Sequence, residues 1–484
     1  MAVEEMISHD HSNSKRNVRF IQYISAICAG VLQISQFVNL SWGSPTLPRL
    51  LAEDSPIGKP LTYDEISWVL SVIYLGTMVG NTLLMVLLDK VGPKSIMLLG
   101  AVLTIISWIF LGLAKSLSVL IIGRVIAGVS DGMSLPCISI YVCEIACKDI
   151  RGRLASIPMF IGVFGNLFIF GAGPYLEYTT LIISCAVFPT IFLVSFSFMP
   201  NSPYFLIRKG KRRDAERSLM RLLGTKSKSQ VEDRLREVEE TVERDTGNLT
   251  LMQSLLMANF RKSLLIVFVA YNIINFCGLT FLSSYLQVFL ATGSISLSKE
   301  LASVFWGLVQ FPAVMLSGLL IDKLGRRPLF CVSSLGAGIA LILEGGYIYL
   351  QGIVNLESVS FLPVLCLSLY GFFISLGVLP LPYILVGELF ATGTKKVGSF
   401  VVSCYSSIII FAHIKVFGSM FDSWGLYSIC WLFGGVCFSG ILFSLLMLPE
   451  TKGKSFNEIQ SNLSSTTKNT SHSHKGDFEM ENVS

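Results

Sequence analysis

The chain alternates between long apolar runs and short polar segments. Each run is long enough to cross a bilayer, because a helical span needs about 20 apolar residues. Less perfect runs raise the total to twelve predicted spans, so we expect an all-α integral membrane protein. The uncharged runs lie at residues 20–48, 66–88, 95–114, 154–176, 263–298, 358–386 and 423–449.

Three landmarks occur twice, in the same order and at similar offsets. The offsets are 233 (322 − 89), 244 (388 − 144) and 249 (449 − 200), which indicates an internal duplication. Parallel six-helix repeats are a known transporter architecture. We therefore predict 12 transmembrane helices in two pseudo-symmetric six-helix bundles. The landmarks are a charged turn at Asp89 and Asp322, an acid after a span at Glu144 and Glu388, and a Pro-rich exit at Pro200 and Pro449.

The predicted spans divide the chain into five parts. The polar segment between the bundles places Val231, Leu235, Val238 and Val242 at helical spacing, which favours surface amphipathic helices that cap the cytoplasmic face between the halves. A solvated linker without regular contacts is the alternative. The parts are an N-terminal tail (1–19), a first bundle (20–199), a linker (200–262), a second bundle (263–449) and a largely disordered tail (450–484).

Composition and charge place the chain in the membrane. It is 52% hydrophobic and 14% charged, which excludes a soluble protein of 484 residues. Of 37 Lys and Arg, 31 fall on one side of the predicted spans and four on the other. Because Lys and Arg are enriched in the cytoplasmic loops of membrane proteins, the side with 31 is predicted to be cytoplasmic, and both termini lie on it. A nucleic-acid partner is not expected. The first apolar run follows a short polar tail of 19 residues and lacks a cleavage signature, so we expect a retained span.

No catalytic or cofactor motif stands out. The eleven Cys lie in or beside apolar runs without paired spacing, as expected of packing residues. There is no Walker loop, so we expect neither an enzyme nor a bound metal or nucleotide.

Several charged residues fall inside spans. Arg124 and Asp131 are seven apart and share a helix face, which fits either mutual or interhelical pairing or an ion or proton site. Glu344 is expected near the outer end of its span, where water solvates it. His413 and Lys415 suggest packing or outer-end contacts. Pro380 and Pro382 remove helix hydrogen bonds and favour a bend around a cavity.

The repeated charged turns suggest gates. Acids at span ends, opposite bases from neighbouring turns, can form ion pairs in one conformation and break them in another. The alternative is that the charges only set topology. The candidate gating residues are Asp89, Arg124, Glu144, Arg151 and Arg153 in the first half and Tyr285, Asp322, Arg326, Arg327, Pro380, Pro382, Glu388 and Lys395 in the second.

These motifs together resemble the sugar-porter branch of the major facilitator superfamily over about residues 20–460. Within that branch the chain is most similar to insect facilitated trehalose and glucose transporters, judged by Ser67-Trp68-Val69 and by the Leu-Pro-Glu-Thr-Lys-Gly-Lys-Ser run from Leu448. The other residues that carry the resemblance are Asp322-Lys-Leu-Gly-Arg-Arg-Pro328, Gly123-Arg124, Glu144 with Arg151-Gly-Arg-Leu, Pro380-Leu-Pro382 and Gly387-Glu-Leu-Phe390.

The resemblance implies a sugar site, with departures. The branch's span 5 glutamine falls at Met159, its span 10 tryptophan at Tyr383 and a nearby acid at Ser375. The pocket has therefore lost amides that would hold hydroxyls, and a smaller or less polar substrate stays open. The implied substrate-binding positions are Met159, Asn275, Thr280, Gln310, Ser375, Tyr383 and Ser406.

The resemblance implies a plasma-membrane transporter for a hexose or a trehalose-like disaccharide that works by facilitated diffusion. Its partners would be the sugar and the lipid bilayer, with a monomer sufficing. Proton-coupled members of the branch carry an acid in span 1, and residues 20–52 contain none. Two alternatives remain: a proton-coupled symporter that uses Asp131, and a sugar sensor that does not transport.

Overall fold

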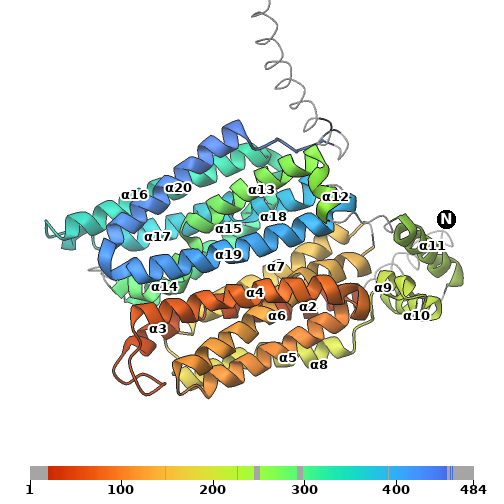
Figure 1. Cartoon of the computed structure of the whole chain (residues 1–484), viewed down its shortest axis with the longest axis horizontal. Helices are drawn as coiled ribbons and strands as arrows, with labels where there is room; N and C mark the ends of the chain where they lie inside the picture. The colour runs from red at the N-terminus through yellow and green to blue at the C-terminus, as the bar shows by residue number, and fades with distance from the viewer. Residues whose placement is uncertain are drawn as a thin grey trace, which may run out of the picture.

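The computed structural model describes residues 20–147, 149–225, 227–244, 251–291, 298–390, 392–454, 458 and 461. The predicted tail 1–19 and most of the tail 450–484 lie outside these residues. Twelve helices of the described part are long and apolar enough to cross a membrane. They run side by side in two groups, one red to yellow and one green to blue (Figure 1). The prediction of an all-α protein with twelve spans is confirmed.

The first group contains six spans. Span 1 consists of two helices that meet at Trp42, and each of the other spans is one helix. The helices are α2 (Phe20–Ser41), α3 (Gly43–Leu51), α4 (Tyr63–Val91), α5 (Pro93–Gly112), α6 (Leu117–Ile145), α7 (Arg151–Gly171) and α8 (Tyr178–Ser197).

The second group repeats this order. Span 7 is broken between α13 and α14, and span 10 passes through the π-helix η2 just before Pro380. The helices are α13 (Ala258–Phe276), α14 (Leu279–Ala291), α15 (Lys299–Leu324), α16 (Arg326–Gln351), α17 (Leu362–Phe373), η2 (Ile374–Val378), α18 (Pro380–Leu389), α19 (Thr392–Trp424) and α20 (Leu426–Leu446), with a short 3-10 turn, η1 (Glu357–Val359), before α17.

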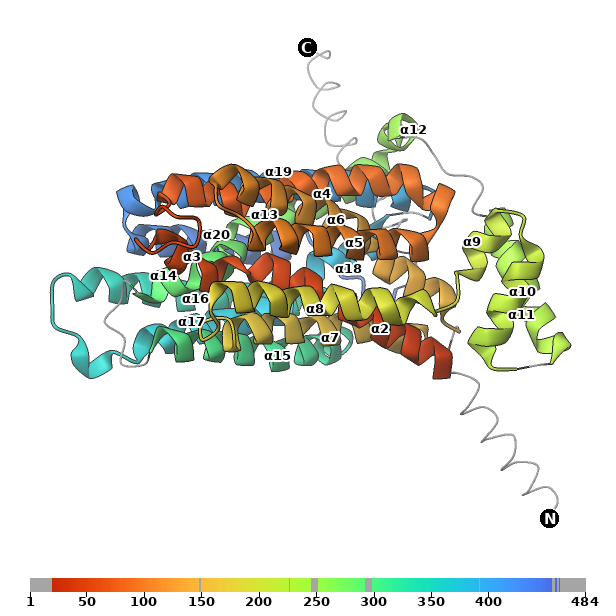
Figure 2. The ribbon, with the colours of Figure 1, turned by 90° about the horizontal axis from the view of Figure 1, so that it is seen from below.

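Four short helices lie between the groups: α9 (Pro203–Arg208), α10 (Arg212–Leu223), α11 (Lys228–Arg244) and α12 (Leu251–Leu256). Figure 2 shows α9, α10 and α11 beside one end of the spans. Val231 and Leu235 of α11 are buried with Leu219 of α10 in a small core of their own. Gln22 of α2 donates to the Leu222 carbonyl at 3.1 Å, which anchors this small core to the first bundle.

Corresponding helices pack together in the same pairs in both halves. Span 1 packs on spans 5 and 6, and span 3 on spans 4 and 6. The corresponding helices of the second half pack in the same pairs: α13 with α19 and α20, and α16 with α17 and α20. Between the halves, α4 packs on α19 and α7 on α15, and exchanging the two bundles turns one interface into the other. The bundles are therefore pseudo-symmetric, as predicted.

Helix breaks also recur at matching places. Span 1 breaks at Trp42, and span 7 breaks before Gly278, whose φ of 96° is a conformation that favours glycine. The two outer segments, α3 and α14, contact each other across the halves. In span 10, η2 precedes Pro380 because proline cannot donate a helix hydrogen bond.

Glycines bring α4 and α6 into backbone contact. A Cβ at Gly128 would lie 1.9 Å from the Ile73 carbonyl oxygen, and a Cβ at Gly76 would lie 2.3 Å from the Val125 oxygen. Without strong hydrophobic driving force between helices in lipid, such close packing holds membrane helices together.

We expect Gly128→Ala to destabilise the first bundle, because the methyl group would overlap the α4 backbone at a cost of about 1–3 kcal/mol. A thermal scan of the purified protein in detergent measures the effect as a lower midpoint. Gly346→Ala in α16 is the matched control, since a Cβ there meets nothing within 4 Å. An unchanged midpoint for Gly128→Ala would contradict the close approach.

Candidate functional site

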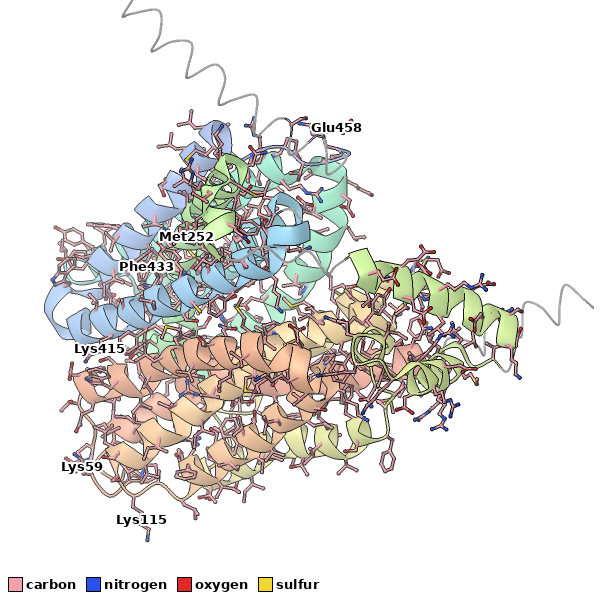
Figure 3. The ribbon with its side chains drawn as sticks, turned by 45° about the vertical axis from the view of Figure 1, so that its right-hand side comes forward. Lys59, Lys115, Met252, Lys415, Phe433 and Glu458 are labelled. Atoms are coloured by element: carbon pink, nitrogen blue, oxygen red, sulfur yellow. The ribbon has the colours of Figure 1, made fainter. Side chains whose placement is uncertain are left out.

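The spans have two distinct ends. We call the end beside α9–α11 the linker end and the opposite end the far end. Figure 3 shows Lys59 and Lys115 at the far end of the first bundle, and Lys415 at the same end between the two bundles. The two charged turns, at Asp89 and Asp322, lie at the linker end, where α4 and α15 finish.

Two candidate substrate residues meet where α13 faces α19. Asn275 Nδ2 donates to Ser406 Oγ at 3.2 Å, and both residues are buried. On the same two helices Asn272 Nδ2 donates to Tyr405 Oη at 2.8 Å, a pair that sequence reasoning missed. Spans 7 and 11 therefore share a polar seam, which was visible in sequence only as isolated polar residues.

Two further candidates lie where α15 faces span 10. A Cβ at Gly371 of α17 would lie 3.4 Å from the Trp306 ring and 3.6 Å from Gln310 Cγ. Ser375 follows one turn after Gly371, in η2, which also packs on α15. Gln310 Nε2, Trp306 Nε1 and Ser375 Oγ are buried, and no hydrogen-bond partner for them occurs in the described part of the chain.

Tyr383 faces the space between the bundles. Its side chain is 58% exposed although α18 lies inside a membrane span. Its ring meets Tyr271 of α13 edge-on at 5.5 Å. An exposed aromatic ring between two bundles is suited to stack on a sugar face.

The remaining candidates are more dispersed. Met159 of α7 and Thr280 of α14 are half-buried, and neither belongs to the contacts above. Tyr285 is fully buried in α14 and stacks on Phe281 at 4.6 Å. Pro380 and Pro382 begin α18, directly after η2.

Arg124 and Asp131 do not pair directly among the described ion pairs. Asn39 of α2 joins them instead, because its carbonyl accepts from Arg124 Nη1 at 2.8 Å and its Nδ2 donates to Asp131 Oδ1 at 3.2 Å. Arg124 also donates to the Val69 carbonyl and lies 5.2 Å from the Trp42 ring centre. Arg124 and Asp131 are therefore paired with groups on neighbouring helices, which is the interhelical pairing that the sequence analysis offered as one alternative.

Glu344 is not solvated as expected. It lies seven residues before the end of α16, yet it is only 1% exposed. The expectation of easy hydration is therefore wrong, because neighbouring helices cover this end of the span. The expectation for span 11 is confirmed: His413 packs edge-on against Phe433 at 5.4 Å, and Lys415 makes a contact at the far end.

Ion pairs bridge the two bundles at both ends of the α4–α19 interface. At the linker end Lys396 Nζ lies 2.6 Å from Asp89 Oδ2. At the far end Lys415 Nζ lies 2.5 Å from Asp64 Oδ1, 2.9 Å from Ser67 Oγ and 4.8 Å from the Trp68 ring centre. Asp89 was a predicted gating residue, whereas Lys396, Asp64 and Lys415 were not.

In each half, an acid at the end of the fourth span contacts the segment that follows the sixth span. Glu144 pairs with Arg208 of α9 at 2.6 Å. Glu388 pairs with Arg326 at 2.7 Å and accepts from Thr451 Oγ1 at 2.6 Å. The matching acids predicted from the repeat therefore occupy equivalent places.

Other predicted gating residues have different partners. Lys395 donates to the Gly387 carbonyl, and Arg327 Nε donates to the Leu448 carbonyl. Asp322 is 79% exposed and lies 3.7 Å from Arg326 of its own turn. The described ion pairs join Glu144 to Arg208 rather than to Arg151 or Arg153.

Glu450 secures the second charged turn. Its carboxylate accepts from the backbone N–H groups of Arg326 and Arg327, each at 3.1 Å, and of Lys452 at 3.0 Å. Burial raises the pKa of this carboxyl, but the three N–H donors outweigh that effect, so the pKa is lowered. The carboxylate thereby occupies the N-terminus of α16, where the helix dipole favours negative charge.

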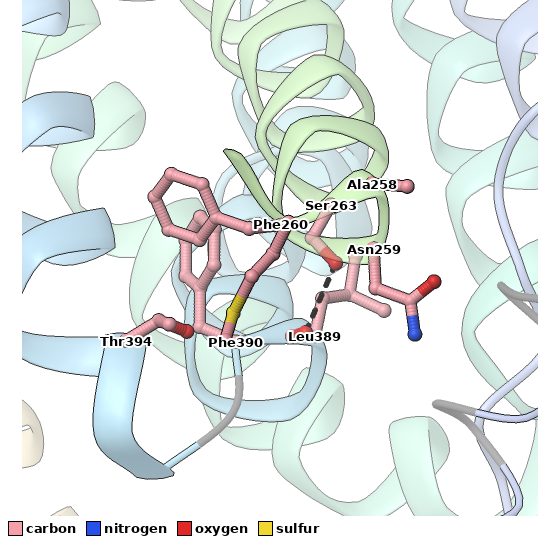
Figure 4. A pocket seen from close by; sticks show the side chains of 8 residues that line it. Ala258, Asn259, Phe260, Ser263, Leu389, Phe390 and Thr394 are labelled. Carbon is pink, nitrogen blue, oxygen red and sulfur yellow. Dashed lines mark hydrogen bonds between the residues drawn. The ribbon is translucent and has the colours of Figure 1, made fainter. Parts of the chain in front are cut away.

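A pocket of about 270 Å³ lies at the linker end of the second bundle, away from the predicted sugar residues (Figure 4). Ser263 Oγ donates to the Leu389 carbonyl at its wall, at 3.0 Å. Its lining residues are Met257, Ala258, Asn259, Phe260, Ser263, Leu389, Phe390 and Thr394. Within the described chain no group of three or more His, Cys, Asp or Glu could hold a metal.

Two pseudo-symmetric six-helix bundles, with polar groups between them and ion pairs at both ends, define a membrane transporter of the major facilitator class. The family model described as "Sugar (and other) transporter" matches residues 26–463. The chain belongs to this sugar transporter family, and the prediction of a transporter rather than an enzyme is confirmed.

Known proteins agree with this assignment. The facilitated trehalose transporter Tret1 of Bombyx mori is 28% identical over 459 residues, covering 94% of this chain and 89% of the relative. Tret1 of Apis mellifera ligustica is 26% identical, covering 93% and 90%. The inward-open xylose transporter XylE of E. coli superposes with a TM-score of 0.75 at 18% identity, covering 91% of this chain and 98% of XylE. The XylE likeness shows the fold.

We expect Glu450→Gln to lower the thermal midpoint by about 2–4 °C, because a charge-assisted contact at a helix N-terminus contributes about 1 kcal/mol. The folded-state pKa is lowered, so the wild-type advantage is present above about pH 4.5 and is lost as the pH falls through the lower folded value. Scans at several pH values measure it. Glu53→Gln, on an exposed acid, is the control; an equal loss there would contradict the role of Glu450.

Proposed function

We propose that this protein carries a hexose or a trehalose-like disaccharide across the plasma membrane by facilitated diffusion, with the sugar held between the two bundles. The observation that carries this proposal is the group of buried polar side chains on the spans of the second bundle: the Asn275–Ser406 pair between α13 and α19, and Gln310 and Ser375 where α15 meets η2. Membership of the sugar transporter family supports the substrate class, and the similarity to Tret1 supports a facilitated mechanism.

The chemistry of this group suits a sugar. Asn275 and Ser406 form one hydrogen-bonding pair, Gln310 and Ser375 supply a second polar side, and Tyr383 supplies an aromatic face. Sugars are bound by amide and hydroxyl groups for their hydroxyls and by a ring for their apolar face. A single chain contains both bundles, so a monomer suffices.

Alternating access follows from the symmetric interfaces. A rocking motion must open one end of the α4–α19 interface while the other stays closed. The Asp89–Lys396 pair holds the linker end and the Asp64–Lys415 pair holds the far end. Because both are exposed enough to exchange with water, each contributes little and can break in turn. The broken spans α2/α3 and α13/α14 supply the bends at the far end.

The distribution of Lys and Arg supports an orientation of the protein in the membrane with the linker end in the cytoplasm. The linker end carries the short basic turns and α9–α11, so the positive-inside bias places it in the cytoplasm and the far end outside. An even number of spans then puts both termini in the cytoplasm. Lys415 and Asp64 accordingly form the outer contact.

We expect uptake of radiolabelled D-glucose or trehalose by proteoliposomes to follow the sugar gradient alone. Span 1 carries Asn39 where an acid would be needed beside Arg124, so an imposed proton gradient should change the initial rate less than about twofold. Accumulation above equilibrium that requires the proton gradient would replace uniport by symport, with Asp131 as the buried carboxyl to test. Binding without flux would instead favour a sensor.

We expect Lys415→Met to weaken outer closure and so favour the outward-open conformation. An exposed ion pair is worth up to about 1 kcal/mol, so the half-saturation concentration for outside sugar should fall, and that for inside sugar rise, by up to about fivefold. Zero-trans influx and efflux measure both values. The double variant Asp64→Lys with Lys415→Asp, which exchanges the two charges, is the control. It should return both half-saturation concentrations toward their wild-type values. Equal changes on both sides would contradict the outer contact.

A further inference from the structure

Span 1 carries four buried amides in different environments, of which Gln22 near the linker end donates to the Leu222 carbonyl as described above. Asn39 is committed to Arg124 and Asp131 by the hydrogen bonds described above. Gln33 packs against α7, since a Cβ at Gly162 would lie 2.4 Å from Gln33 Cγ. Gln36 differs: it is 2% exposed, and neither its Nε2 nor its Oε1 has a hydrogen-bond partner among the described residues.

The helical geometry indicates where Gln36 points. Gly43 lies seven residues later, directly after Trp42, whose φ of −53° and ψ of −31° keep the helical direction across the junction, so Gly43 is on the same face, about 10 Å nearer the far end. A Cβ at Gly43 would lie 3.3 Å from the Ser284 carbonyl of α14, in the second bundle, and 2.6 Å from the Leu70 side chain of α4. This face of span 1 therefore looks across to the other bundle, beneath the closed α3–α14 contact.

The depth of Gln36 also matches that of a ligand site. It lies 15 residues before the end of span 1 at Leu51, near the middle of that span. Gln310 lies 11 residues after the start of α15, again near the middle, and it too has a buried amide nitrogen without a described partner. The two bundles therefore each place one amide at mid-membrane depth.

A buried amide with both polar atoms unpaired costs stability, since each such group loses its hydrogen bonds to water. Membrane interiors make this cost larger, so an unpaired amide there calls for a partner that the described chain does not supply. A sugar hydroxyl both donates and accepts, so one hydroxyl, or two adjacent ones, can satisfy Oε1 and Nε2 together.

We infer that Gln36 is a sugar-binding residue of the first bundle, whose amide holds a ring hydroxyl opposite the residues of the second bundle. The inference rests on the proposed sugar transport. Gln36 would also replace a missing group, because the glutamine that the sugar-porter branch has in span 5 of the first bundle is Met159 in this chain. A residue that contacts the sugar from the first bundle is also what alternating access requires, because each bundle must grip the substrate while the other moves.

The test measures which hydroxyl is recognised. Uptake of radiolabelled D-glucose and trehalose is competed with the series of singly deoxygenated D-glucoses, in wild type and in Gln36→Met, which keeps the side-chain volume. We expect Gln36→Met to raise the half-saturation concentration about three- to tenfold, the worth of one hydrogen bond, while the maximal rate stays within about twofold. It should also abolish the discrimination against one deoxy-sugar and leave the others unchanged.

Gln287→Met is the matched control, because Gln287 is an equally buried span glutamine whose Nε2 donates to Ser303 Oγ at 3.4 Å. Its discrimination profile should be that of the wild type. Should Gln36→Met fail to reach the surface, Gln36→Asn, which keeps the amide but shortens it, should still lower affinity for the same hydroxyl. Wild-type uptake with an unchanged profile in both variants overturns the inference alone, whereas no wild-type uptake overturns the proposed function as well.

Discussion

The high cost of leaving a charge or a polar group unpaired in hydrocarbon is the constraint on which this structure depends. It forces the backbone into helices, which satisfy their own N–H and C=O groups. It also moves the acid–base pairs to the helix ends and leaves only a few charged residues inside. Arg124 and Asp131 remain there because Asn39 and the Val69 carbonyl provide hydrogen bonds from neighbouring helices.

The same constraint shapes the interface between the bundles. Two helices can slide against each other only if the polar contacts between them can be replaced by water when they separate. The bridging pairs Asp64–Lys415 and Asp89–Lys396 meet this condition because they lie at the two ends of α4 and α19. The contacts within each half, such as those of Glu388 and Glu450, instead keep a bundle rigid. The contacts within each bundle are thus distinct from the two ion pairs between the bundles, which we propose exchange between conformations.

Polar groups inside the spans are the exception. Asn275 and Ser406 satisfy each other, while Gln310, Ser375 and Gln36 have buried polar atoms without described partners. Such unsatisfied groups are tolerated where a polar ligand completes their hydrogen bonds. Compared with the sugar-porter pattern, the proposed site has fewer amides and retains one exposed ring, Tyr383, so we propose that recognition relies on stacking as well as on hydrogen bonds.

The sequence by itself determined the twelve spans, the duplication, the clustering of charge at the helix ends and the identity of several polar residues in spans 7, 8, 10 and 11, because hydropathy and repeated spacing are properties of local segments. Only the tertiary structure decided which residues meet. Lys396 rather than Lys395 reaches Asp89, Arg208 rather than Arg151 reaches Glu144, and neighbouring helices bury Glu344. Partner choice depends on how far each helix is rotated about its axis and shifted along it, and those two quantities are set by packing between distant segments such as the glycines of α4 and α6.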